Sequence, residues 1–336
     1  MNNARHYVIP YTMRIFNALP GSAVAKGLGF AMVLLLLFFG GRVATDGGVN
    51  STAGDLRLAL IHISLTAYAV FAYVYLQNTT NEVLRDLAPT IGQTPQWQRI
   101  VAQVGTYHRG GLIVAAILGL LIYAYATEIT TVDSDPWRWA DTQYDSRWMR
   151  IIGPLFAVWT SSVLYVMLVE SARLSKLSES IESLDLLDLR PYEPLTRLGL
   201  TNALLVVGMA SVLSLFLMEP GFAFFIASML LMFTVYAWVG LMLPLRGIRK
   251  KISSAKDVEL DWCRQALQAA RTQLQADGSG EHSIVEISAY KAQIDGIRNW
   301  PFDNPTLIRF ALYLLIPFVS MFGGAFLERA IELFLF

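Results

Sequence analysis

The sequence has little of what secreted domains and nucleic-acid-binding proteins rely on. Only 15% of its 336 residues are charged, and it contains one cysteine, Cys263. A single cysteine cannot form a disulfide within the chain, so a fold held together by disulfides is excluded. The 26 basic and 26 acidic residues balance to zero net charge, so the chain lacks the overall positive field that attracts nucleic acids. We expect no nucleic-acid partner and an inert thiol at Cys263.

Signatures of catalysis and metal binding are also missing. The chain contains no Gly-x-Ser-x-Gly, no His-Glu-x-x-His, no phosphate-binding loop and no Cys-x-x-Cys. Its four histidines lie in different segments, and no two are spaced to hold a metal ion or a haem on one helix. One loop is rich in aspartate but lacks the glycine-centred spacing of a calcium loop; its acids are Asp133, Asp135, Asp141 and Asp145. We predict that the protein is not an enzyme and binds no metal and no cofactor.

What the chain does have is long apolar runs. It is 54% hydrophobic with a mean hydropathy of +0.46, which lies outside the composition of soluble domains. A membrane-spanning helix needs about 20 mostly apolar residues, and seven such runs are present, near 24–44, 57–76, 110–128, 150–170, 198–218, 222–245 and 305–327. No small-residue cleavage site follows the first run, so we expect it to stay as a span. The sequence predicts an all-α, polytopic membrane protein with about seven spans.

Basic residues in the short loops predict the orientation. The N-terminal tail carries Arg5, Arg14 and Lys26 without an acid, and the loop after the sixth run opens with four cations, Arg246, Arg249, Lys250 and Lys251. Loops rich in lysine and arginine stay in the cytosol, and six spans between these two loops make the assignments agree. The aspartate-rich third loop then falls outside. We predict an N-terminus inside and a C-terminus outside.

Three regions follow from this topology. Residues 1–247 hold the first six spans with their cytosolic connectors, residues 248–304 are predicted to form a cytosolic helical hairpin, and residues 305–336 hold the seventh helix and a tail. Helix-favouring stretches around the turn signal Asp277–Gly280 support the hairpin. We expect 171–190 and 250–300 to be the segments that would contact a cytosolic protein partner.

The segment after the fourth run is amphipathic. Its apolar residues recur at helical spacing and are Leu174, Leu177, Ile181 and Leu184. This face would pack on the hairpin, extend the fourth span below the bilayer, or lie on the lipid surface. The first two arrangements are favoured, because a lipid-bound helix would carry more basic residues than Arg173 and Lys176.

Two runs share a short motif, Arg-x-Gly-Leu-x-x-Ala, which begins at Arg109 in one and at Arg197 in the other. With the connectors, this motif suggests a repeat of three helix pairs, 2–3, 4–5 and 6–7, each joined on the cytosolic side. A chance match between two apolar helices is the alternative, and it is the favoured one.

The seventh run carries polar and small residues along one stripe at steps of three or four: Arg309, Tyr313, Pro317, Ser320, Gly324 and Glu328. In a functional interpretation the stripe lines a path, and Glu328 from several subunits forms an acidic ring of the kind that cation channels use. In the structural interpretation, which is slightly favoured, the small residues admit a neighbouring helix and the two charges lie at the membrane interfaces.

His62 is the ionisable residue placed well inside a span. Such residues are functional candidates by default, but a neutral imidazole can also bond to a neighbouring helix, and this structural role is favoured. Glu128 and Glu170 fall at the ends of spans, where we expect them to be flanking charges.

These observations favour an oligomeric channel, with cation selectivity as one form of it, in which the seventh helix lines the pore and cytosolic helices assemble or gate it. A membrane scaffold or sensor acting through cytosolic helices, and a secondary transporter, are the alternatives. The topology resembles that of insect chemosensory receptor channels, in which the last helix lines the pore; no residue is carried over from them. The expected partners are the lipid bilayer and further copies of the chain, and the expected location is a bacterial inner membrane.

Overall fold

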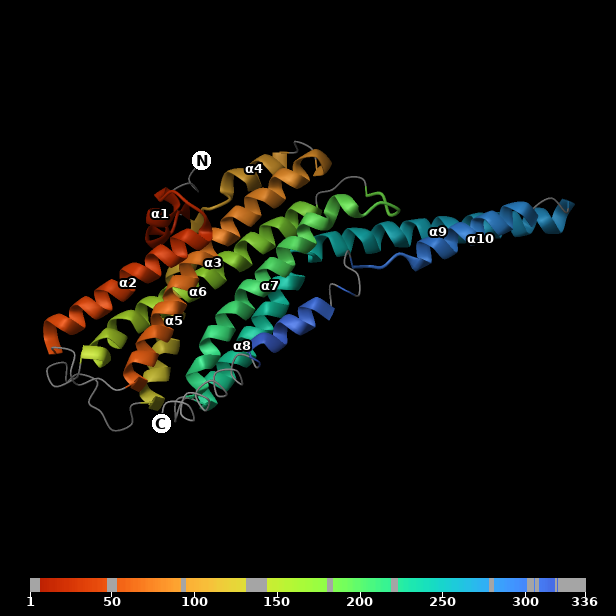
Figure 1. The fold of residues 1–336 in the computed structure, drawn as a ribbon. Coiled ribbons are helices and arrows are strands. Elements are labelled where there is room, and N and C mark those ends of the chain that lie inside the picture. Colours follow the sequence, from red (N-terminus) through yellow and green to blue (C-terminus); the bar gives the residue numbers. More distant parts are fainter. Residues whose placement is uncertain are drawn as a thin grey trace.

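The protein is almost entirely helical in its structure, a computed structural model (Figure 1). The structure describes residues 7–46, 53–91, 95–130, 144–179, 184–218, 223–277, 281–300, 305, 308–317 and 319. The helices are α1 (Tyr11–Ala18), α2 (Ala23–Asp46), α3 (Ala53–Ile91), α4 (Pro95–Gln103), α5 (Arg109–Thr130), α6 (Tyr144–Glu179), α7 (Glu193–Leu213), α8 (Ala223–Met242), α9 (Arg246–Asp277) and α10 (Glu281–Gly296). Two-residue strands β1 (Tyr7–Val8) and β2 (Tyr107–His108) pair antiparallel, and short 3-10 turns cover Arg190–Tyr192 and Ser214–Met218.

Six helices among the described residues are long and apolar enough to cross a bilayer, as in an integral membrane protein. They cover Ala23–Ala44, Leu56–Ile91, Arg109–Ala126, Arg147–Glu179, Arg190–Phe216 and Phe225–Met242, and each overlaps one of the first six predicted spans. The all-α membrane architecture is therefore confirmed. Of the seventh predicted span, the structure describes a shorter apolar helix, Ile308–Pro317. The count of seven and the orientation stay predictions.

Two spans continue as helices far beyond their predicted ends. α3 runs on to Ile91 and α6 to Glu179, so the amphipathic segment after the fourth run begins as an extension of α6. Its Leu174 and Leu177 are fully buried, and α6 packs against α9. The segment therefore continues the fourth predicted span as one helix, and this helix packs against α9. The part of this apolar face formed by Leu174 and Leu177 is covered within the chain, whereas Ile181 lies outside the described residues.

The bundle is built around α3, which packs on α2, α6 and α7. The other extensive contacts join α5 to α6 and α7 to α8. In the numbering of the predicted spans these are pairs 3–4 and 5–6, whereas the short motif suggests pairs 2–3, 4–5 and 6–7. The glycines of the two motifs share a packing role instead. A Cβ on Gly111 would overlap the Tyr165 ring, and one on Gly199 would lie 2.6 Å from the carbonyl oxygen of Leu241.

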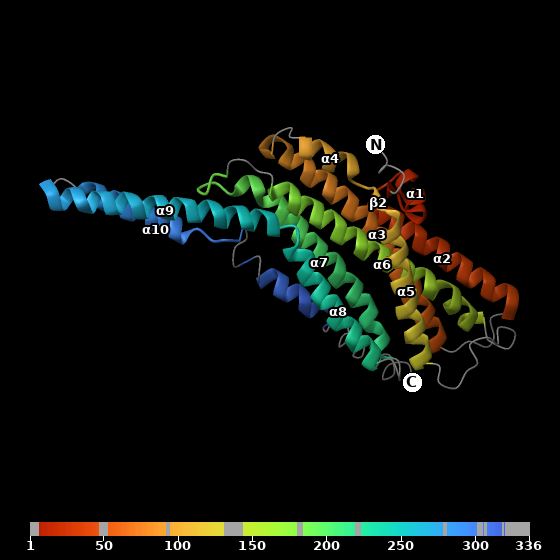
Figure 2. The ribbon, with the colours of Figure 1, turned by 180° about the vertical axis from the view of Figure 1, so that it is seen from behind.

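α9 and α10 form an antiparallel hairpin that projects beyond the bundle (Figures 1 and 2). α9 follows α8 after a short turn but runs in a different direction from α7 and α8 (Figure 1). Within the hairpin, Lys256 Nζ donates hydrogen bonds to the carbonyls of Asp295 (2.8 Å) and Ile297 (2.9 Å). Cys263 and Ile294 are fully buried, so the two helices have a packed interface of their own.

Candidate functional site

Buried polar side chains concentrate on the last third of α6, where the bundle meets the hairpin. We call this stretch the α6 junction; its members are Glu170, Ser171, Arg173, Ser175 and Ser178. The Glu170 side chain is 1% exposed and that of Arg173 12% exposed, and the three serines are buried. Polar groups are buried at a cost unless they are hydrogen-bonded, so this clustering calls for an account of each partner.

Glu170 and Arg173 hold the turn between α4 and β2. Glu170 Oε1 accepts a hydrogen bond from the backbone N–H of Gly105 and an ion-pair hydrogen bond from Arg173, both at 3.2 Å. The Arg173 guanidinium also donates to the carbonyls of Gln103 (2.8 Å) and Thr106 (2.7 Å). Gly105 has a φ of +77°, a conformation that favours glycine. One turn of α6 thus fixes a tight backbone turn of the chain.

Tyr107 completes this polar contact from β2. It is fully buried, its hydroxyl accepts a hydrogen bond from Gln77 Nε2 of α3, and the Arg173 guanidinium lies 5.5 Å from its ring centroid. Burial, and then the neighbouring Glu170 charge, raise the pKa of Tyr107 above its ordinary value, so the phenol stays protonated. Among the described residues, Glu170 Oε2 and the buried Tyr73 hydroxyl make no hydrogen bond.

The serines of the α6 junction contact α7 and α9. Asn202 of α7 donates to Ser171 Oγ at 2.9 Å, and the backbone N–H of Gly247, in the first turn of α9, donates to Ser175 Oγ at 3.0 Å. A Cβ on Gly247 would overlap the carbonyl of Ser175 and the hydroxyl of Ser178. The backbones of α6 and α9 therefore touch. The α6 junction joins the turn, α7 and the base of the hairpin through one helix.

The chemistry available at the α6 junction is electrostatic and structural. Within the described parts of the chain, no three His, Cys, Asp or Glu side chains come together as metal ligands. The Glu170 carboxylate, held by an arginine and a backbone amide, is suited to fixing the turn between α4 and β2, and Ser175 is suited to fixing the hairpin base.

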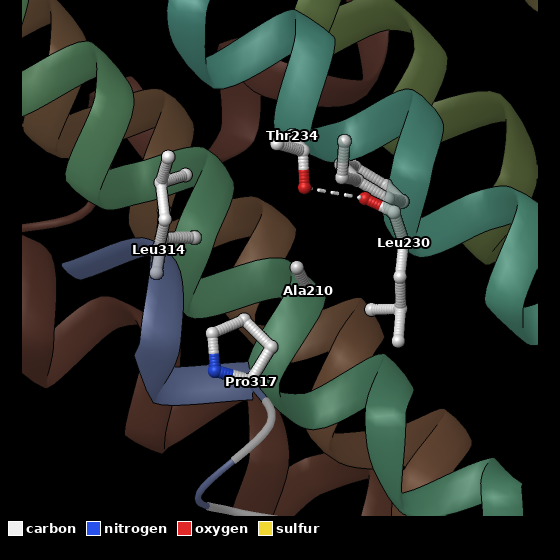
Figure 3. A pocket seen from close by; sticks show the side chains of 7 residues that line it. Ala210, Leu230, Thr234, Leu314 and Pro317 are labelled. Atoms are coloured by element: carbon white, nitrogen blue, oxygen red, sulfur yellow. Dashed lines mark hydrogen bonds between the residues drawn. The ribbon is translucent and has the colours of Figure 1, made fainter. Parts of the chain in front are cut away.

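The stripe predicted on the seventh helix is described over its first half. Arg309 is exposed, Tyr313 is half-buried and Pro317 is buried. Pro317 and Leu314 border a small, mostly apolar pocket that Ala210 of α7 and Leu230 and Thr234 of α8 also line (Figure 3). Tyr313 and Pro317 thus pack on the bundle of their own chain, whereas Arg309 is exposed. Ser320, Gly324 and Glu328 lie outside the described residues, as do Asp133, Asp135 and Asp141.

His62 bonds within its own helix. Its Nδ1 lies 2.9 Å from the carbonyl oxygen of Leu58, and its ring meets that of Phe216 edge-on at 5.0 Å. The carbonyl of His62 accepts a hydrogen bond from Thr66 Oγ1 at 2.7 Å. These contacts are those of a packed structural residue.

Sequence reasoning missed Glu170, because a charge at the end of an apolar run was interpreted as a flanking charge. That interpretation is wrong, since the side chain is buried. The available signal was the sequence around it. The apolar spacing continues through Leu174 and Leu177, and Arg173 lies at i+3, so a helix that stays packed past Glu170 would bury the pair.

Comparisons of the chain with protein-family models, with curated proteins and with solved structures find no match. The functional argument therefore depends on the residues and their geometry.

Proposed function

We propose that this protein is a membrane-anchored assembly protein: its apolar helices hold it in the bilayer, and the α9–α10 hairpin presents a docking surface to another protein on the predicted cytosolic side. The observation that carries the proposal is a packed helical hairpin that projects beyond the bundle (Figures 1 and 2) while its base is fixed by the α6 junction.

The surface of the hairpin supports this proposal. Val258 is 68% exposed, Trp262 53% and Val285 63%. Large apolar side chains on the bundle helices face lipid in a membrane protein, but the hairpin extends away from the bundle, where these three side chains would meet water. Val258 and Trp262 lie one helical turn apart on α9, and neighbouring exposed apolar groups of this kind mark interaction sites. Tryptophan is also enriched among the residues that dominate interfaces.

The hairpin is also preorganised. The Trp262 ring meets the Tyr290 ring edge-on at 6.0 Å, and the Tyr290 hydroxyl donates to Glu259 at 3.2 Å. At the base, the Arg249 guanidinium lies 4.4 Å from the centroid of the Trp300 ring. A surface that is already ordered loses less conformational entropy when it binds.

The test is to excise the hairpin. Residues 257–294 can be replaced by a short Gly/Ser linker, because Lys256 and Asp295 are in contact. Both forms are expressed in native membranes, extracted in polymer nanodiscs and weighed by mass photometry. We expect the full chain in particles heavier than one chain, and the excised chain in lighter particles that still contain the folded bundle. The same number of chains and the same bound proteins per particle in both forms would contradict the proposal.

An oligomeric channel, with cation selectivity as one form, is the second candidate. The polar and small-residue stripe predicted on the seventh helix supports it, and the pocket beside Pro317 (Figure 3) marks where the described part of that stripe meets α7 and α8. Its test is ion flux into proteoliposomes. Glu328→Gln should change the preference among cations, and the matched control Glu332→Gln should not. Flux equal to that of protein-free liposomes would remove this candidate.

A further inference from the structure

α9 has three distinct sides along its length. One side packs on α10 and includes the buried Cys263 and Ala270. A second side carries the charges Asp257, Asp261, Arg264 and Arg271. The third side has no charge. Its members are all exposed and follow one another at steps of three or four: Ser254, Val258, Trp262, Gln265, Ala269, Thr272 and Ala276. We call this third side the uncharged face.

The uncharged face has the character of a helix-packing surface. Exposed helix faces that meet only water normally carry charged residues, whereas the exposed charges of this part of α9 gather on another side. Spacing that alternates between three and four residues is the pattern by which one helix packs along another. A face that bound lipid would need bulky apolar residues flanked by several cations, but four of its seven members are Ala, Ser or Thr.

We propose that a second copy of this chain occupies the uncharged face, with its own α9 running antiparallel. This inference rests on the proposed function and names the partner. Its first support is size complementarity. When the Gln265 residues of the two copies face each other at the centre of the antiparallel α9 pair, Trp262 of each copy lies opposite Ala269 of the other. A large side chain then meets a small one twice. A twofold interface must be self-complementary in this way. In the parallel arrangement the two Trp262 rings would face each other, and so would the two Ala269 methyls.

The direction of α9 agrees with this arrangement. It turns away from α7 and α8 (Figures 1 and 2), so it has a component along the membrane plane. Two copies in one membrane, related by a twofold axis along the membrane normal, then send their hairpins in opposite lateral directions. Their uncharged faces can cross in the antiparallel sense.

The area fits a dimer that depends on the membrane. From Ser254 to Ala276 the face is about 33 Å long at 1.5 Å per residue, and a helix is about 10–12 Å wide, so each copy buries roughly 400 Å². A standard stable interface buries about 800 Å² per partner. Confinement of both copies to one bilayer raises their effective concentration, as a linker does, and compensates for the smaller area.

Cysteine cross-linking in native membranes tests the proposal, with the native thiol removed by Cys263→Ala. Gln265→Cys should join two copies through a short bismaleimide. Arg264→Cys, at the same height but on the charged side, should not. Val258→Cys alone should fail, because its two copies lie about 21 Å apart in the antiparallel pair. Chains with Val258→Cys and differently tagged chains with Thr272→Cys should cross-link when they are co-expressed.

A second pair of variants covers the case in which the reagent fails to reach the thiols. Ala269→Lys should shift native nanodisc particles from two copies to one, whereas Gln268→Lys should leave two copies; both side chains are exposed, so folding is not at stake. Equal cross-linking at 264 and 265, self-cross-linking of Val258→Cys, or one copy per particle in the parent protein would overturn the proposal. Particles with one copy and a different protein would keep the proposed assembly function while overturning the second copy.

Discussion

The ion pair of the α6 junction provides a sharp test of how this bundle is held together. Arg173→Met removes the guanidinium but keeps a side chain of similar length. It leaves the Glu170 carboxylate, 1% exposed, without its cationic partner, although the Gly105 N–H still donates to it. It also leaves the carbonyls of Gln103 and Thr106 without the hydrogen bonds that Arg173 donates.

The expected cost follows from this burial. Removing one partner of a buried ion pair costs about 3–5 kcal/mol, because the remaining charge is left unpaired. Arg173 is 12% exposed, which places the expectation at the lower end, about 3 kcal/mol. At about 2 °C per kcal/mol for a large domain, the unfolding temperature should fall by roughly 6 °C. The double variant Glu170→Gln/Arg173→Met removes the unpaired charge and should recover part of this loss.

A matched control lies in the same bundle. Arg197 and Asp86 join α7 to α3 by an ion pair whose side chains are 55% and 47% exposed. Exposed pairs contribute about 0–1 kcal/mol, so Arg197→Met should lower the unfolding temperature by about 2 °C at most. Helicity at 222 nm is followed on heating, in one detergent and at one protein concentration. If Arg173→Met and Arg197→Met shift the transition equally, burial of the α6 junction is not what stabilises it.

Two further predictions concern the hairpin base and the topology. Gly247→Ala should destabilise the protein by about 1–3 kcal/mol through overpacking against α6, as measured by the same thermal melts. The control Gly40→Ala, at a position with open space around it, should be neutral or stabilising by up to about 1 kcal/mol. Equal effects of the two substitutions would contradict the contact between α6 and α9. In whole cells whose protein lacks its native cysteine, an impermeant maleimide should label Asp135→Cys from outside and leave Gln268→Cys unlabelled until the cells are opened, and the reverse pattern would invert the predicted orientation.

The native cysteine itself is a poor topology reporter. Cys263 is fully buried, so it would resist an impermeant reagent on either side of the membrane. An exposed neighbour such as Gln268 gives an answer that depends on the membrane and not on packing. The expectation of an inert thiol agrees with this burial.

The positions of the first six spans could be predicted because they depend on local composition. In a bilayer each backbone must satisfy its own hydrogen bonds, so an apolar run of sufficient length becomes a helix whatever its neighbours are. The continuation of α3 and α6 past the apolar runs was harder to predict. Past the apolar runs, apolar residues no longer cover the whole circumference of the helix but only one stripe, as at Leu174 and Leu177. The length over which this stripe is packed depends on a neighbouring helix.

The α6 junction could not be predicted, because its partners are distant in sequence. Gly105 lies 65 residues from Glu170, and Gly247 lies 72 residues from Ser175. An acid at the end of an apolar run has the same sequence pattern whether it meets water or a buried arginine. The stripe on the seventh helix shows the same limit. The spacing of Tyr313 and Pro317 indicates that they share a helix face, but the packing of Pro317 beside α7 and α8 depends on tertiary contacts that the spacing does not reveal.

Photo-cross-linking in intact membranes shows whether the hairpin binds a protein. A benzophenone amino acid replaces Val258 on the uncharged face or Arg264 on the charged side, and intact native membranes are illuminated. We expect a discrete protein adduct from position 258 and little from position 264. Adducts to lipid alone at position 258, or the same weak labelling at both positions, would contradict the claim that this hairpin is a protein-docking element.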